Sequence, residues 1–213
     1  MPRSSLAQLA PLPRSFFNRD PRMVGRELLG KVLLRREGRA ILAGRIVECE
    51  AYLGADDAAA HAAAGKTARN AVLFGPPGFA YVYFIYGNHY CLNVSCLPDG
   101  EAGGVLFRAL EPIAGVERMA ANRQLEPREA RLIASGPGRL AEAMAITRER
   151  DNGKDFVSSR SDLRIVDDGF GAVEVRETPR IGITKSADLP LRYVVAGSPF
   201  VSGKRNFGIT PIP

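Results

Sequence analysis

Two glutamates spaced two residues apart are the side chains of this chain best placed for acid–base chemistry. Glu48 and Glu50 lie in a run rich in β-branched residues, 40–53, that predicts a strand. Side chains alternate along a strand, so both carboxylates and the ring of Tyr52 should share one face. Adjacent carboxylates raise each other's pKa, which suits proton transfer, and a neighbouring ring could bind a flat base. The simpler interpretation, two solvated acids on an exposed face, stays open here.

The densest aromatic stretch follows a Pro-Pro-Gly loop. Four of the six tyrosines fall within ten residues, at positions 81, 83, 86 and 90. Two β-prone runs on either side of Gly87 and Asn88 predict a hairpin. Tyr81 and Tyr83 fit a strand face packed into the core, whereas Tyr86 stands at the tip, where burial is difficult. An aromatic side chain at an exposed tip could pry apart a step of a nucleic-acid duplex.

The residue types disfavour a metal centre. The chain has two histidines, His61 and His89, and three cysteines without a CxxC pair, which argues against a structural metal site. Carboxylates could still bind Mg²⁺, but the sequence has no DxD or two-metal pattern. We expect no metal and no cofactor. His61 lies among small residues, where an ordinary polar role and a functional role are both open. The stretch 135–139, Ser-Gly-Pro-Gly-Arg, precedes a predicted helix and could hold a phosphate through backbone N–H groups, or form a plain turn.

The elements that must position these residues are short strands and separate groups of helices. Asp20 before Pro21 predicts the start of a helix that ends before Gly30. Successive hairpins with helices in separate groups indicate an α+β fold with a mostly antiparallel sheet and flanking helices, and no composition break marks a second domain. Further helices are predicted over 111–121, 125–133 and 139–146, and strands over 31–36, 40–53, 79–86, 89–95, 104–110, 163–166, 172–177, 180–184 and 192–195.

The composition is that of one globular domain. Of the 213 residues, 46% are hydrophobic and 24% charged, which suffices for one core and argues against general disorder. We expect a flexible tail over 1–14 and the domain over 15–213. No apolar run approaches the length of a membrane helix, and the N-terminus lacks the apolar core of a secretory signal. With three cysteines that form no disulfide pattern, the cytoplasm is the expected compartment.

The charge balance leaves the kind of partner open. Lys plus Arg number 29 and Asp plus Glu 23, a net charge of +6, and 24 of the basic residues are arginine. Guanidinium groups suit phosphates and flat bases better than ammonium groups do. A comparable excess also occurs in proteins that bind no nucleic acid, so the charge by itself does not decide.

Several motifs occur together in an order that resembles the alkyladenine (3-methyladenine) DNA glycosylase family. They are Gly-Arg-Ile-Val-Glu-Cys-Glu-Ala-Tyr-Leu-Gly at 44–54, His61, Tyr-Val-Tyr-Phe-Ile-Tyr-Gly at 81–87, Asn93, Arg-Ala-Leu-Glu-Pro at 108–112, Ser-Gly-Pro at 135–137, Pro-Arg-Ile-Gly at 179–182 and Gly-Ser-Pro at 197–199. The resemblance extends from about Phe16 to Ser202. It implies one domain with a curved antiparallel sheet and a protruding hairpin.

The resemblance also implies roles within a single site. Glu50 would be the general base that activates water, and Arg108 and the backbone carbonyl of Ile181 would help to hold that water. Asn93 would exclude the 2-amino group of normal guanine. The residues that would contact a flipped base are Tyr52, His61 and Tyr83.

The DNA contacts are implied in the same way. Tyr86 would fill the gap that the flipped base leaves, and Asn88 and His89 would contact DNA at the hairpin tip. The phosphate candidates are Lys66, Arg69 and Arg139. The expected partner is double-stranded DNA containing damaged purines, bound by a monomer associated with the nucleoid.

The implied reaction is hydrolysis of the N-glycosidic bond of 3-methyladenine, 7-methylguanine, hypoxanthine or ethenoadenine. No lysine adjoins Glu50 and the family uses water as nucleophile, so a monofunctional enzyme without metal is expected. Two alternatives remain. A non-catalytic damaged-DNA binding module would need the basic surface and the aromatic residues but not Glu50. A hydrolase of free nucleosides or sugars would need Glu50 but neither Tyr86 nor the excess of arginine.

Overall fold

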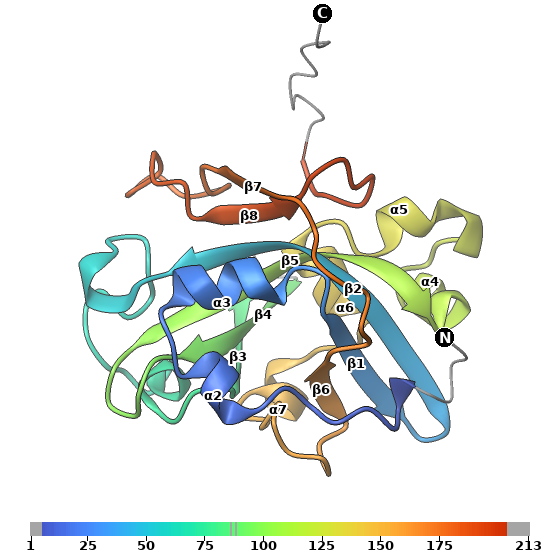
Figure 1. Cartoon of the computed structure of the whole chain (residues 1–213), viewed down its shortest axis with the longest axis horizontal. Coiled ribbons are helices and arrows are strands. Elements are labelled where there is room, and N and C mark those ends of the chain that lie inside the picture. The colour runs from blue at the N-terminus through green and yellow to red at the C-terminus, as the bar shows by residue number, and fades with distance from the viewer. Residues whose placement is uncertain (1–5, 86, 88, 204–213) are drawn as a thin grey trace, which may run out of the picture.

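Two long antiparallel strands, β2 (Ala40–Tyr52) and β5 (Gly103–Ala114), form the centre of the molecule (Figure 1). The structure is a computed structural model that describes residues 6–85, 87 and 89–203. Within this part of the chain, an eight-stranded sheet runs in the order β3-β4-β5-β2-β1-β6, and β8 joins β2 and carries β7 on its other side. All of these strand pairs are antiparallel, so the predicted α+β domain is confirmed.

The other elements surround this central pair. The remaining strands are β1 (Val32–Glu37), β3 (Ala80–Ile85), β4 (His89–Cys96), β6 (Leu163–Val166), β7 (Val175–Thr178) and β8 (Arg192–Val195). The helices are α2 (Arg14–Phe17), α3 (Pro21–Leu28), α4 (Val116–Asn122), α5 (Ala130–Ile133), α6 (Pro137–Ala143) and α7 (Arg148–Asp151). Three short 3-10 turns, η1 (Gly54–Asp56), η2 (Ala71–Phe74) and η3 (Pro127–Glu129), lie in the connections.

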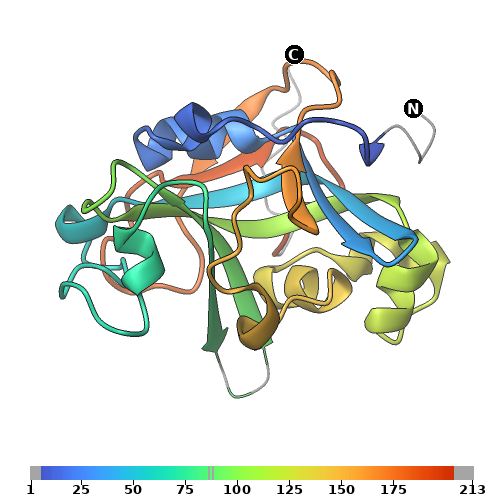
Figure 2. The same ribbon diagram turned by 90° about the horizontal axis from the view of Figure 1, so that it is seen from below.

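Helices cover the sheet from opposite sides. Figure 2 shows α2 and α3, in blue, on one side, and the helices coloured lime to gold on the other. The approach of α3 is close, since a Cβ atom on Gly25 would lie 2.9 Å from the ring of Tyr193 in β8. The strand residues on that face, such as Cys49 and Val105, are fully buried and form the core with α3. The opposite face is therefore the one left for polar chemistry.

Strand β2 changes partner halfway along its length. Its first half pairs with β1 and its second half pairs with β8, through Glu48 opposite Val194 and Glu50 opposite Arg192. The register with β5 shifts on both sides of Glu48, the sign of a β-bulge. Bulges re-aim side chains, and here the irregularity lies where β2 carries its two glutamates.

Much of the local pattern agrees with the sequence-based prediction. The side chain of Asp20 accepts a hydrogen bond from the Arg22 N–H and so caps α3, and Gly30 after the helix has a φ of +86°. The hairpin is confirmed: β3 and β4 pair from Ala80 opposite Val94 to Ile85 opposite His89. Figure 2 shows its two strands extending beyond the rest of the sheet.

Five predicted elements differ from those in the structure. Residues 111–114 continue β5 through pairing with β2, and α4 begins only at Val116, so the helix predicted from 111 is wrong at its start. The helix predicted over 125–133 is a 3-10 turn followed by the short α5, and α6 starts at Pro137, earlier than expected, and ends at Ala143. The strand predicted over 172–177 is confined to β7, and the stretch 180–184 is a loop. At 111–114, pairing with β2 set the boundary rather than local propensity.

The described part of the expected tail packs against the domain. Leu6 and Leu12 are both buried, and the Leu12 N–H donates to the carbonyl of Ile165 in β6. Residues 6–14 therefore differ from the loose tail expected from their prolines, because two leucines find apolar partners that only the folded sheet provides.

Candidate active site

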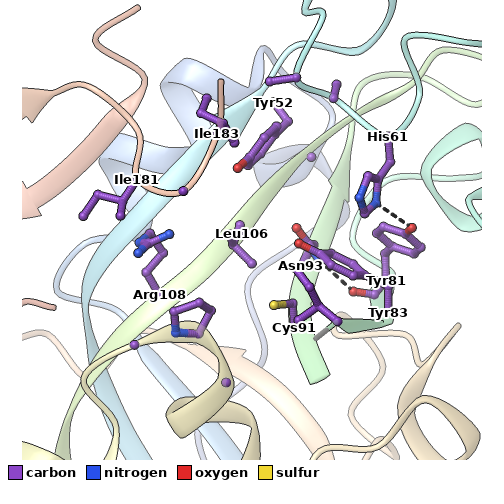
Figure 3. Close-up of a pocket in the computed structure, with 18 of the residues that line it drawn as sticks. Tyr52, His61, Tyr81, Tyr83, Cys91, Asn93, Leu106, Arg108, Ile181 and Ile183 are labelled. Carbon is purple, nitrogen blue, oxygen red and sulfur yellow. Dashed lines mark hydrogen bonds between the residues drawn. The ribbon is translucent and has the colours of Figure 1, made fainter. Parts of the chain in front are cut away.

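A row of residues across four strands underlies a pocket on the polar face of the sheet. Glu50 in β2 lies opposite Leu106 in β5, Leu106 opposite Asn93 in β4, and Asn93 opposite Tyr81 in β3. Residues that face each other across antiparallel strands share one face. The pocket above this row has a volume of about 800 Å³, and the loops 54–62, 135–139 and 181–183 complete its walls (Figure 3).

Glu50 is completely buried behind the lining residues. Its Oε1 accepts a hydrogen bond from the Ile181 N–H (2.8 Å) and forms an ion pair with Arg108 Nη1 (3.2 Å), and its Oε2 accepts from the Tyr52 hydroxyl (3.0 Å). Burial raises the pKa of Glu50 above its ordinary value, although Arg108, the Ile181 N–H and the Tyr52 hydroxyl oppose that rise. A carboxylate with a raised pKa is a stronger proton acceptor once it is ionised.

Glu48 is the second buried carboxylate, and it holds cations in place. Its Oε1 accepts from Arg108 Nε (2.8 Å), Arg192 Nε (2.7 Å) and the Ser202 hydroxyl (2.9 Å), and its Oε2 accepts from the Ser202 N–H (2.6 Å). Neither Glu48 nor Glu50 is exposed, so the interpretation as two solvated acids is wrong. Arg108 thus lies between two carboxylates, which hold its pKa above the ordinary value although burial alone would lower it.

An aromatic group forms the wall opposite Arg108. His61 Nδ1 lies 2.9 Å from the Tyr81 hydroxyl, and the His61 ring meets the Tyr83 ring edge-on, with centroids 4.4 Å apart. Partial burial and the charge of Arg69 lower the pKa of His61. Figure 3 shows Tyr52 across the pocket from His61 and Tyr83, so flat faces border the space from two sides. Such an arrangement suits a planar ring.

Tyr81 and Asn93 shape the floor between these walls. The Asn93 side-chain amide donates to the Tyr81 carbonyl (3.1 Å), which fixes the amide in the pocket. The sequence predicts Tyr81 as a core residue, and it is indeed 1% exposed, but it also lines the pocket and contacts His61. Its place two residues before Tyr83 on the same strand face was the signal for this role.

Ile181 reaches the site through its backbone. The loop after β7 brings its N–H onto Glu50, while its side chain is exposed at the pocket mouth. The contact seen is therefore made by the N–H group, and the role expected for the carbonyl stays a prediction. The sequence predicted a strand here, and a loop serves the site better because a strand N–H would be used in pairing.

The residues expected to contact DNA fall into three groups. Tyr86 and Asn88 lie outside the described residues. His89 and Arg139 line the pocket, and His89 packs so closely on α6 that a Cβ atom on Gly138 would lie 2.9 Å from its ring. Lys66 and Arg69 are exposed on the loop after His61, outside the pocket lining.

Arg69 has contacts that the sequence did not indicate. Its guanidinium lies 5.8 Å from the centroid of the Tyr83 ring, and its Nη2 is 3.5 Å from the Phe84 carbonyl. It is therefore placed beside the aromatic wall rather than alone on the surface. Its expected contact with a phosphate remains a prediction.

The described residues contain neither a metal-binding cluster nor a membrane-spanning helix. Over residues 6–85, 87 and 89–203, no group of three or more His, Cys, Asp or Glu side chains is arranged to hold a metal ion. In the same part of the chain, no helix has both the length and the apolar character that crossing a membrane requires.

Comparison with known proteins gives one consistent result. The sequence model described as methylpurine-DNA glycosylase matches residues 15–199. A protein of Koribacter versatilis (strain Ellin345) is 92% identical over 205 residues, 96% of this chain and 99% of its own. A protein of Burkholderia cenocepacia (strain HI2424) is 51% identical over 193 residues, 90% of this chain and 91% of its own. Both carry the name "Putative 3-methyladenine DNA glycosylase".

Proposed function

The chain belongs to the methylpurine-DNA glycosylase family, whose members are DNA-repair hydrolases of N-glycosyl bonds, and we propose that it is a monofunctional enzyme that flips damaged purines out of duplex DNA. The proposed substrates are 3-methyladenine, 7-methylguanine, hypoxanthine and ethenoadenine. The names of the relatives support the first of these. The products would be the free base and an abasic site, which begins base excision repair.

The observation that carries this proposal is the buried carboxylate beside a fixed cation, directly behind an aromatic pocket. Glu50 lies 3.2 Å from Arg108, and Tyr52 both lines the pocket and hydrogen-bonds to Glu50. A carboxylate oxygen has two lone pairs, and the Tyr52 hydroxyl uses one of those on Oε2. We propose that the other accepts a hydrogen bond from a water molecule once a nucleotide occupies the pocket.

The proposed chemistry moves one proton and breaks one bond. Glu50 accepts a proton from water while the water oxygen attacks C1′ of the sugar, and the C1′–N bond breaks with its electron pair going to the base. Positive charge develops on the sugar during this step, and the negative charge of Glu50 stabilises it. An alkylated purine that already carries positive charge leaves as a neutral base. A neutral purine such as hypoxanthine must gain a proton to leave equally well.

Base recognition is assigned to the walls and floor of the pocket. We assign stacking on the flipped base to Tyr52, Tyr83 and His61, which border the pocket from two sides. His61 has a lowered pKa and so remains neutral at physiological pH, and it does not repel a cationic base. Asn93, held by the Tyr81 carbonyl, is assigned to clash with the 2-amino group of guanine.

The proposal also assigns residues to DNA contact and an oligomeric state and location to the enzyme. Tyr86 would occupy the gap in the duplex, supported by Asn88 and His89, and phosphates would be bound by Lys66, Arg69 and Arg139. The enzyme would act as a monomer on the nucleoid in the cytoplasm. The net charge of +6 favours such a partner, since the DNA backbone is an anion.

Single-turnover base release tests this function. Duplex oligonucleotides with one hypoxanthine or ethenoadenine, and methylated DNA in parallel, are incubated with the protein in EDTA. Release of free base that leaves an uncut but alkali-labile strand is the expected result. Lesion binding without release would instead indicate a damage-recognition module, and release from free nucleosides with no duplex preference would indicate a nucleoside hydrolase.

A further inference from the structure

Asp57 and Arg180 form a buried ion pair immediately behind the pocket. Arg180 Nη1 lies 2.5 Å from Asp57 Oδ2 and Nη2 lies 2.8 Å from Oδ1, so the contact is bidentate. Both side chains are fully buried, and neither lines the pocket. The pair joins two pocket loops that are 123 residues apart in the sequence.

Asp57 fixes the loop that carries His61. Besides Arg180, its carboxylate accepts hydrogen bonds from the Leu53 N–H (3.2 Å) and the Ala59 N–H (3.1 Å). Burial alone would raise the pKa of Asp57, but Arg180 and these N–H groups hold it below the ordinary value, so the side chain stays ionised. The loop is therefore tied to Arg180 by a permanent charge.

Arg180 contacts the end of β2 and the loop that follows its own position. Its Nη1 donates to the Ala51 carbonyl (2.9 Å), and its guanidinium lies 4.6 Å from the centroid of the Tyr52 ring. The next residue is Ile181, whose N–H donates to Glu50 (2.8 Å). The buried Arg180 side chain thus lies against the Tyr52 ring, and the backbone of Arg180 leads directly to the N–H that donates to Glu50.

A role in stability alone does not account for this placement. Taking two charges out of water costs free energy that the mutual attraction often fails to recover, so a buried ion pair is weak evidence of stabilisation. The molecule has a second fully buried pair, Arg35 with Asp151 (2.8 Å), that contacts no residue of the pocket lining by hydrogen bond or ion pair. The Asp57–Arg180 pair joins two loops of the pocket, whereas the Arg35–Asp151 pair has no hydrogen bond or ion pair to a pocket-lining residue. The Arg35–Asp151 pair is therefore a suitable control.

We propose that Asp57 and Arg180 are positioning residues of the reaction, which hold the Ile181 N–H on Glu50 and the Tyr52 ring against the bound base without touching either substrate or reacting atoms. This inference rests on the proposed function for its effect on catalysis. Its structural content, that the pair holds the Ile181 N–H, stands in the free protein and can be measured there.

The direction of a pKa shift separates positioning from simple electrostatics. Removing the negative charge of Asp57 leaves more positive charge near Glu50, which by itself lowers the Glu50 pKa. Losing the Ile181 N–H bond raises it, because that bond favours the ionised form. The other titratable or charged groups facing Glu50, which the substitution leaves unchanged, are Glu48, Cys49, Tyr52, Cys91, Arg108 and Arg192.

The test compares Asp57→Asn with the control Asp151→Asn, both of which keep side-chain shape and remove one charge from a buried pair. In the free protein, amide hydrogen exchange of Ile181 and the carboxyl titration of Glu50 are followed by NMR. In Asp57→Asn we expect the Ile181 amide to exchange about tenfold faster and the Glu50 pKa to rise. In Asp151→Asn both stay at wild-type values, although thermal stability falls.

Base release gives the second readout. We expect single-turnover release by Asp57→Asn to be slowed about tenfold or more, since small misplacements of catalytic groups are costly, with a smaller effect on lesion binding. If the single variant does not fold, the double variant Asp57→Asn/Arg180→Met replaces it, because removing both charges leaves no unpaired buried ion. The exchange rate of the Ile181 amide is then measured in the double variant.

The outcomes separate this proposal from the proposed function. Wild-type exchange at Ile181, or an unchanged or lowered Glu50 pKa in Asp57→Asn, overturns the positioning role whatever the enzyme does. Absence of base release by the wild-type protein overturns the function, and the NMR measurements still decide the positioning role.

Discussion

Glu50 is placed where its charge is both disfavoured by burial and stabilised by neighbouring groups. Full burial opposes ionisation, and three donors, Arg108, the Ile181 N–H and the Tyr52 hydroxyl, favour it. The balance leaves the pKa raised, which means that the folded protein binds a proton at Glu50 more tightly than the unfolded chain does. Buried ionisable groups that lower stability in this way are common at functional sites.

Replacing Glu50 by glutamine tests its role directly. Glu50→Gln should reduce base release by about 10²–10⁴-fold, the usual contribution of a general base, while binding to lesion-containing DNA persists. At neutral pH its thermal stability should equal or exceed that of wild type, because the variant avoids burying a charge. Single-turnover release, lesion binding and melting curves are the measurements. Turnover close to wild type would refute the assignment of the base.

The pH dependence of the reaction follows from the same balance. Glu50 must be ionised to accept a proton, and its pKa is raised, so the rate should climb with pH through a midpoint above that of an exposed glutamate. DNA containing 7-methylguanine is the suitable substrate, since this cationic base leaves without a further proton. A midpoint at or below about 4.3, the ordinary value for glutamate, would contradict the proposal that buried Glu50 is the group whose ionisation limits the rate.

At the level of elements, strand register builds the site. The bulge around Glu48 lies where β2 leaves β1 and joins β8, and it brings Arg108 of β5 between the two glutamates. The hairpin β3–β4 contributes the aromatic wall from the next strands in the sheet. A shift of one residue in any of these pairings would turn the side chains to the opposite face.

The packing of α6 on the hairpin should be sensitive to one methyl group. In Gly138→Ala the new Cβ would meet His89 at 2.9 Å from Cγ and 3.1 Å from Cβ, atoms close to the strand backbone that cannot swing away. We expect lesion binding to weaken about tenfold, with about 1–3 kcal/mol lost from the free energy of unfolding, as for other overpacked sites.

Gly75→Ala is the matched control for that variant. Gly75 has a φ of −94°, and its nearest neighbour would lie 3.5 Å from a new Cβ, so alanine fits there without strain. Binding measured by fluorescence anisotropy and melting temperatures are compared for the two variants. If the two substitutions weakened lesion binding equally, His89 would no longer be assigned to DNA contact.

At the level of the whole molecule, one face of the sheet packs into the hydrophobic core and the other carries the pocket. The face under α3 is packed with apolar residues, whereas the other buries two glutamates and the arginines that pair with them. The pocket opens on this second face, with Arg139 exposed at its rim. The net charge of +6 favours association with an anion such as DNA, and Arg139 is our proposed phosphate contact at the pocket rim.

Salt dependence of DNA binding should report these contacts. If Arg139 binds one phosphate, Arg139→Ala should reduce the slope of log affinity against log salt by about 0.9. Arg118→Ala is the control, because Arg118 is 62% exposed on α4 and lies outside the pocket lining. Titrations of duplex DNA at several salt concentrations measure both. An unchanged slope for Arg139→Ala would place the phosphate contacts elsewhere.

The sequence predicted the local features that depend on near neighbours. The cap at Asp20, the long strand that contains both glutamates and the hairpin around Gly87 follow from side-chain preferences and from alternation, so they could be predicted without the fold. The resemblance of several ordered motifs then indicated the family that the comparisons confirmed.

Only the tertiary structure decided how far those residues are buried and which groups contact them. Whether Glu48 and Glu50 are solvated or buried depends on Arg108, Ile181 and Ser202, which lie 58 to 154 residues further along the chain. The start of α4 was misplaced because strand pairing overrides local propensity, and residues 6–14 are packed because their leucines meet a distant strand. Alternation along a strand is a local property, whereas burial, pKa and the joining of two loops by Asp57 and Arg180 require contacts between distant segments.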